Sequence, residues 1–298
     1  MSEKILILTG GSIKGAFQAG ALRTLFNQGF KPTKVLGISV GALNSTFLVN
    51  RIGELNNNFT WEQLGDDIVN FWIDTVKEPS DLVLKKSKLR LAWEILRKDF
   101  NGFLDTRPLQ EKIRKIAKPE NLKRANIKLE IGAVNILTGD IEYFSPEHPN
   151  FIDAVIASTA IPFVMPYNNI GGKPYVDGGV RDVAPVGPLI EQKNVSEIVV
   201  VSCHASKLRT LDNDFNPGDI MKFSDRIKNI LVNETVNNDI ALLEKSKIKR
   251  TKLNLKPLKF KVIQPKEEIN IDITKFTPGD ILKMIEMGEK AANGDWIS

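Results

Sequence analysis

Cysteine and histidine are scarce in this sequence. Its 298 residues include one cysteine, Cys203, and two histidines, His148 and His204. A single cysteine excludes an internal disulfide framework and fits a reducing compartment. With so few thiol and imidazole ligands, the composition argues against a dedicated transition-metal site.

Long apolar runs and nucleic-acid signatures are also missing. The N-terminal apolar run at 4–8 lacks the architecture of a signal peptide. The longest uncharged run, 154–172, contains two prolines, two asparagines and a glycine pair, which make a poor membrane helix. Aromatic residues amount to 7%, and no zinc-finger spacing appears, so we expect no nucleic-acid partner. The expectation is a soluble, cytoplasmic protein.

The residues that are present have the balance of a globular domain, with 42% hydrophobic and 26% charged. No stretch rich in proline, glycine or serine divides the chain, so we expect a single domain over 1–298. The net charge of +5 permits an acidic partner or peripheral contact with an anionic membrane surface, without requiring either.

Strand and helix signals alternate in the first half of the chain. Apolar runs at 4–8 and 34–38 predict strands, and each is followed by a helical pattern, which favours a parallel sheet covered by helices. The sequence also predicts a hairpin over 126–144, strands at 173–177, 197–203 and 262–265, and a helix that starts near Pro278. We therefore expect an α/β fold with a core at about 4–205, a helical cap candidate at 60–118 and a helical and strand extension over 218–298.

A glycine-rich loop follows the first predicted strand at residues 10–15. Its unpaired N–H groups at a helix N-terminus could hold a phosphate or an oxyanion, or the loop is simply a tight turn. The Lys-Ser/Thr pair of a nucleotide-binding loop is missing, and Ser12 breaks the dinucleotide-binding spacing. Lys14 opposes the dipole of the following helix, so it needs a carboxylate partner or a charged substrate group, unless it is solvated.

The second glycine site is Gly37-Ile38-Ser39-Val40-Gly41. A strand precedes it and a helix follows, which is the context required of a nucleophile elbow. The two glycines remove side chains that would collide with the strained turn, and the turn exposes the Ser39 hydroxyl.

The third site is Asp177-Gly178-Gly179, at the end of a predicted strand. The aspartate then lies at the carboxyl edge of a parallel sheet, where such folds place their sites, or it belongs to an ordinary turn. A serine nucleophile needs a base. The order Ser39, Asp177, His204 suits a hydrolase triad, a Ser39–Asp177 dyad is the alternative, and His148 is expected at the surface.

These three motifs, in this order and spacing, resemble those of patatin-like phospholipases, as do residues 157–167 and the C-terminal region. The resemblance implies a three-layer α/β/α domain with a mostly parallel sheet that hydrolyses lipid acyl esters with no metal or organic cofactor. It implies Ser39 as nucleophile and Asp177, rather than His204, as base. It further implies an oxyanion hole and supporting glycines: Gly10, Gly11, Ser12, Ile13, Lys14 and Gly15 for the hole, and Gly37, Gly41, Gly178 and Gly179 around the dyad. Ser12 and Lys14 depart from the glycine and arginine usual in the family.

Three other activities fit parts of the sequence: an acyltransferase that uses the same dyad, a lipid-binding protein whose catalysis has decayed, and a nucleotide-binding protein. Residues 80–104 mix leucines and a tryptophan with basic residues, and a second basic run lies at 245–261. The apolar residues of 80–104 pack on the core, or this segment forms a basic amphipathic helix that caps Ser39 and touches anionic lipid.

Overall fold

A mostly parallel sheet organises the chain, whose computed structural model describes residues 2–212 and 215–294. The strand order is β10-β9-β1-β2-β5-β8-β7, and β6 pairs with β5. The parallel strands are β1 (Glu3–Leu8), β2 (Lys34–Ile38), β5 (Lys128–Asn135), β9 (Val195–Val201) and β10 (Lys259–Ile263). The antiparallel strands are β6 (Ile141–Phe144), β7 (Asn168–Ile170) and β8 (Lys173–Asp177). The predicted α/β fold and the predicted hairpin, formed by β5 and β6, are confirmed.

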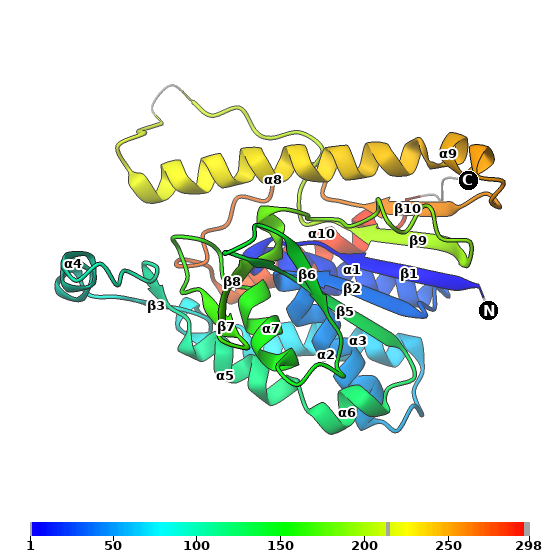
Figure 1. Cartoon of the computed structure of the whole chain (residues 1–298), viewed down its shortest axis with the longest axis horizontal. Helices are drawn as coiled ribbons and strands as arrows, with labels where there is room; N and C mark the ends of the chain where they lie inside the picture. Colours follow the sequence, from blue (N-terminus) through cyan, green and yellow to red (C-terminus); the bar gives the residue numbers. More distant parts are fainter. Residues whose placement is uncertain (1, 213–214, 295–298) are drawn as a thin grey trace.

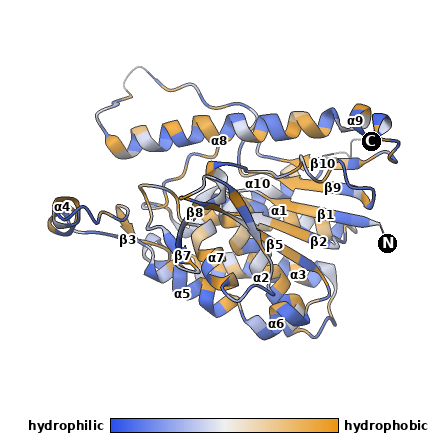
Figure 2. Cartoon of the chain, viewed as in Figure 1, coloured by the Kyte–Doolittle hydropathy of each residue, from blue (hydrophilic) through white to orange (hydrophobic). Residues whose placement is uncertain are grey.

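Alternate residues of each strand point to opposite sides of the sheet, and each side is covered by other segments of the chain, so both faces of the sheet are buried. In β1, Leu6 and Leu8 join the larger hydrophobic cluster, and Ile5 and Ile7 join the smaller one. Figure 2 shows the resulting hydrophobic colour along β2, β5 and β9. The larger cluster includes residues of α1 (Gly15–Asn27), α2 (Val40–Glu54), α3 (Trp61–Thr75), α5 (Arg107–Ile116), α7 (Phe151–Ser158) and α10 (Pro278–Ala291).

The opposite face is covered by residues 184–190 and by the long helix α8 (Ile220–Glu244), which Figure 1 shows lying across the top of the sheet. Leu243 of α8 belongs to the smaller cluster. The short helices α6 (Pro119–Arg124) and α9 (Ser246–Lys252) complete the layers, which together give the three-layer arrangement that the motifs imply.

The C-terminal helix α10 packs against α1 with backbone in close contact. A Cβ atom added at Gly20 would lie 1.9 Å from the carbonyl oxygen of Ile285, and one at Gly288 would lie 2.0 Å from that of Phe17. Thr277 and Asp280 form a capping box at the start of α10, with Pro278 in the first turn as predicted. The C-terminal segment therefore belongs to the same core as the N-terminal motifs.

Other predicted elements differ in the structure. The strand expected at 197–203 is β9, which begins and ends two residues earlier, at Val195 and Val201. The strand expected at 262–265 begins earlier, at Lys259, because it pairs with β9 along its whole length, and it ends at Ile263. Residues 80–104 are not one amphipathic helix: the α-helical part is α4 (Lys88–Leu96), between the paired strands β3 (Leu84–Lys85) and β4 (Leu104–Asp105). Within 2–212 and 215–294, no helix combines the length and the apolar character needed to cross a bilayer.

Candidate active site

Ser39 occupies a strained turn between β2 and α2. Its φ of 57° and ψ of −124° lie outside the regions that residues other than glycine ordinarily adopt. The flanking glycines make the turn possible, since a Cβ atom at Gly41 would lie 2.0 Å from the carbonyl oxygen of Leu8. The Ser39 N–H donates a 2.9 Å hydrogen bond to the hydroxyl of Ser158, the last residue of α7.

Asp177 reaches Ser39 by a route that the sequence did not indicate. The expectation of a parallel strand is wrong, because β8 runs antiparallel to β5. Ile38 ends β2 opposite Gly132, but β5 continues to Asn135, and β8 pairs with this extension. Asp177 is the register partner of Ala133, the residue after Gly132, so the end of β8 lies level with the turn at Ser39.

Ser39 and Asp177 are both buried, and the Ser39 side chain lies close enough to the Asp177 carboxyl to influence its pKa. Burial raises the pKa of Asp177 from 3.8 to about 6, against the opposing effects of the Ser39 side chain, of a hydrogen bond from the Gly179 N–H and of the positive charge of Lys228. A carboxylate with this pKa is a stronger base than an exposed aspartate, yet it is ionised at neutral pH.

Residues 10–15 form a loop that lies against Ser39. A Cβ atom at Gly10 would come within 3.1 Å of the Ser39 Cβ, and one at Gly11 would collide with Cys203 at 2.2 Å. The loop continues into the short 3-10 turn η1 (Ser12–Lys14). In that turn the N–H of Lys14 donates to the carbonyl of Gly11, and the N–H of Gly15 is bonded within the turn. The expectation that the whole loop offers its N–H groups to an oxyanion is therefore too broad.

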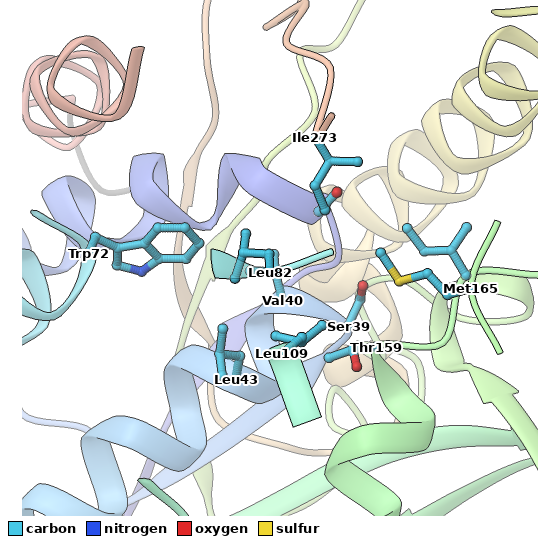
Figure 3. A pocket seen from close by; sticks show the side chains of 11 residues that line it. Ser39, Val40, Leu43, Trp72, Leu82, Leu109, Thr159, Met165 and Ile273 are labelled. Carbon is cyan, nitrogen blue, oxygen red and sulfur yellow. The ribbon is translucent and has the colours of Figure 1, made fainter. Parts of the chain in front are cut away.

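A narrow pocket of about 30 Å³ opens beside Ser39 (Figure 3). Figure 3 shows the Ser39 hydroxyl between Thr159 and Met165. The apolar side chains that line the pocket come from distant parts of the chain: Val40, Leu43, Trp72, Leu82, Leu109, Ile161, Met165 and Ile273. An apolar wall next to a buried hydroxyl and carboxylate suits a substrate with an apolar group beside its reacting bond.

Comparison with known proteins bears on this geometry. The family described as patatin-like phospholipase matches residues 6–190, which is more than half of the chain. The chain belongs to this family. It is 27% identical over 250 residues to a protein named triacylglycerol lipase 5 from Saccharomyces cerevisiae, a match that covers 73% of this chain and 32% of that protein. The chain thus spans about a third of the length of this curated relative.

Two solved structures are similar to the chain at low sequence identity. VipD from Legionella pneumophila aligns with a TM-score of 0.41 and 13% identity, over 98% of this chain and 66% of that one. A chain in the complex of SpcU with ExoU, from the type III secretion system of Pseudomonas aeruginosa, aligns with a TM-score of 0.36 and 16% identity, over 82% of this chain and 53% of that one.

At its two departures from the family pattern, the chain has Ser12 at the pocket wall and Lys14 with a buried side chain. The alternative in which the Lys14 side chain is solvated is therefore wrong. Burial lowers the pKa of Lys14, and Lys228, Asp225 and Glu268 act on that pKa in opposing directions.

The two histidines lie in different surroundings. His204 is buried, and its pKa lies well below the usual value, chiefly because of burial and also because of nearby lysines. His148 is half-buried at the start of α7, where it accepts a hydrogen bond from the Asn150 N–H. In the part of the chain that the structure describes, no three histidine, cysteine or acidic side chains gather as a metal site.

Sequence reasoning missed two residues near Ser39 and Asp177, namely Ser158 and Lys228. Ser158 lies in the segment 157–167 that resembles the family, but no role was assigned to it there, and Lys228 lies on α8, far from every motif in the sequence. A single sequence carries no signal that would connect either residue to Ser39.

Proposed function

We propose that the protein hydrolyses acyl ester bonds of lipids, as a phospholipase A or lipid acyl hydrolase, through an acyl-enzyme on Ser39. The observation that carries the proposal is the placement of Ser39 beside the carboxyl of Asp177, both buried, at a strained turn that faces an apolar pocket. Membership of the patatin-like phospholipase family and the name of the yeast relative favour a lipid ester.

The proposed reaction uses the groups of the chain and water. The Asp177 carboxylate accepts the Ser39 proton as Oγ attacks the ester carbonyl, and the alcohol then leaves with that proton. Water hydrolyses the acyl-enzyme by the reverse transfers. The N–H groups of Gly10, Gly11, Ser12 and Ile13 are our candidates for the oxyanion hole, because those of Lys14 and Gly15 are already bonded. One such donor typically contributes about 2.7–4 kcal/mol to the transition state.

The acyl chain must displace side chains to enter the pocket. A volume of about 30 Å³ accommodates only roughly one or two water molecules. Met165 and Ile161 line this pocket together with Leu82, which precedes the β3–α4–β4 segment. We propose that these apolar residues move apart around the substrate. Within residues 80–104, only the first few residues, near Leu82, then cover the pocket as a cap.

A fluorophosphonate probe, with the labelled residue read by mass spectrometry, tests the assignment. Wild type should be labelled at Ser39. Labelling should survive His204→Ala, because the neutral imidazole of His204 takes no part in the reaction. It should be lost in Asp177→Asn and Ser39→Ala. Labelling that depends on His204 would contradict the dyad, and a wild type that is never labelled would favour a lipid-binding protein without catalysis.

An acyltransferase would form the same acyl-enzyme. Adding an alcohol or thiol acceptor during turnover separates the two activities, because a transferase produces acylated acceptor in preference to free acid. We expect free acid to dominate with each acceptor tested.

A further inference from the structure

Helix α4 stands apart from the layers of the protein. In Figure 1 it lies at one end of the long axis, carried by two arms that pair through β3 and β4. None of its residues is buried. A helix of nine residues is too short to be stable in water through its own hydrogen bonds. Packing against the rest of the chain therefore does not explain why its sequence is amphipathic.

The most exposed face of α4 is apolar. Leu89, Trp93 and Leu96 are spaced by four and three residues, so they lie on one side of the helix, and they are 83%, 58% and 77% exposed. Single exposed apolar residues are common, but three large ones together on one short helix mark an interaction surface. A tryptophan at such a position is typical of side chains that sit at a membrane–water boundary.

Basic side chains flank this apolar face. Lys85, Lys88 and Lys98 are exposed, and the guanidinium of Arg97 lies 5.5 Å from the centre of the Trp93 ring. The acidic residue of the helix, Glu94, is neutralised by ion pairs with Lys86 and Arg90. The surface that α4 offers is therefore apolar along its centre and cationic around it, which complements the anionic face of a lipid bilayer.

Lys86 has a structural part in this arrangement. Its side chain is 3% exposed, and its ammonium group donates to Glu94 and to the carbonyl of Asn101. These bonds join the two arms and fix the orientation of α4. Lys86 is therefore not one of the basic residues that this surface offers to a lipid, because its charge is already paired inside the segment.

The base of the segment is attached to the rim of the pocket. The N–H of Phe103 donates to the carbonyl of Phe163, at 3.1 Å, and that of Leu104 donates to Val164, at 2.9 Å. Phe163 has a φ of 64° and is 75% exposed, and it stands between Ile161 and Met165, which line the pocket. An apolar side chain thus points outward at the rim, close to the arm that carries α4.

From these observations we infer that α4 and Phe163 insert into the interface of an anionic lipid bilayer and turn the pocket beside Ser39 towards it. The choice of a lipid bilayer as the binding partner of this surface rests on the proposed function, in which the pocket accepts an acyl chain. Lys85, Lys88 and Lys98 reach the anionic headgroups, and Leu89, Trp93 and Leu96 enter the boundary of the acyl region. A lipid then passes from the bilayer into the pocket without crossing water.

The test measures binding of the full chain to vesicles of phosphatidylcholine with and without phosphatidylserine. The protein carries Ser39→Ala, so the lipid is not consumed. Replacing Leu89 and Leu96 by glutamate should weaken binding to the anionic vesicles at least about tenfold, as should Lys85→Gln with Lys88→Gln. The matched controls are Leu282→Glu, an exposed leucine on α10, and Lys252→Gln with Lys256→Gln, and each should leave the affinity within about twofold.

Insertion has a signature of its own. Vesicles with brominated acyl chains should quench the tryptophan emission of the Ser39→Ala protein, and Trp93→Phe should remove most of that quenching while binding persists. Quenching that is unchanged by Trp93→Phe would overturn the inference, as would equal binding to neutral and anionic vesicles. Self-association without lipid that Leu96→Glu abolishes would also overturn it, since the occupant would then be a second copy of the chain.

Activity separates this inference from the proposed function. Wild type should hydrolyse a soluble short-chain ester, and Leu89→Glu with Leu96→Glu should lower the ratio of vesicle to soluble-ester hydrolysis at least about tenfold. Vesicle binding with no hydrolysis of any ester would refute the proposed function and leave the docking surface supported. Ester hydrolysis with no vesicle binding would refute the docking surface alone.

Discussion

The acidic limb of the pH–rate profile should report the carboxyl group of Asp177. Only the carboxylate can accept the Ser39 proton, and burial raises the pKa of Asp177 to about 6. At pH 5 about a tenth of the protein then carries an ionised Asp177, so kcat/KM should be about tenfold below its plateau. An aspartate with its ordinary pKa would be almost fully ionised at pH 5, and the rate would hardly change.

The charge of Lys228 allows this assignment to be tested by substitution. Its positive charge favours the Asp177 carboxylate, so Lys228→Gln should raise the pKa and move the acidic limb to higher pH. Lys222→Gln, which removes an exposed lysine from the same helix, should leave the limb in place. His204 cannot produce a limb near pH 6, because its pKa lies well below the usual 6.5.

The assay is the hydrolysis of a soluble short-chain ester, which keeps lipid binding out of the rate. We would measure kcat/KM from pH 4 to pH 9 for wild type, both lysine variants and His204→Ala. A limb at or below pH 4 would refute the raised pKa. If the acidic limb disappears in His204→Ala, then His204 rather than Asp177 accepts the Ser39 proton.

Three further predictions concern stability, measured by thermal and urea unfolding. Because the pKa of Asp177 is raised in the folded protein, ionising this residue opposes folding, and Asp177→Asn should stabilise the protein by up to about 3 kcal/mol at pH 8. This gain in stability should shrink as the pH falls through about 6 and vanish near pH 4. A variant that is less stable than wild type at pH 8 would contradict this reasoning. Ser158→Ala leaves the N–H of Ser39 buried without its acceptor and should cost about 1–3 kcal/mol, whereas an unchanged midpoint would mean that another group takes over the bond. Gly20→Ala places a Cβ atom 1.9 Å from a carbonyl oxygen of α10 and should cost about 1–3 kcal/mol, while Gly187→Ala, in open space, serves as the neutral control.

Much of the fold could be predicted from local patterns. The short apolar runs and the helical spacing that follows each of them are sufficient to predict β1, α1, β2 and α2, and the alternating pattern at 126–144 predicts the hairpin of β5 and β6. The segment at 80–104 is different, because its periodicity is helical over a longer stretch than the helix that forms. There, pairing between β3 and β4 and the ion pair of Lys86 with Glu94 override the local preference.

The sequence by itself determined the local chemistry of the site. Glycines two residues before and after Ser39 permit a turn that a side chain would block, and the motifs pointed to the family without any coordinates. Only the tertiary structure decided which groups meet. Asp177 reaches Ser39 because β5 extends beyond the end of β2 and β8 pairs with that extension of β5. Burial then raises the pKa of the Asp177 carboxyl. Strand register and burial depend on contacts between residues far apart in the chain, and a local pattern carries no record of them.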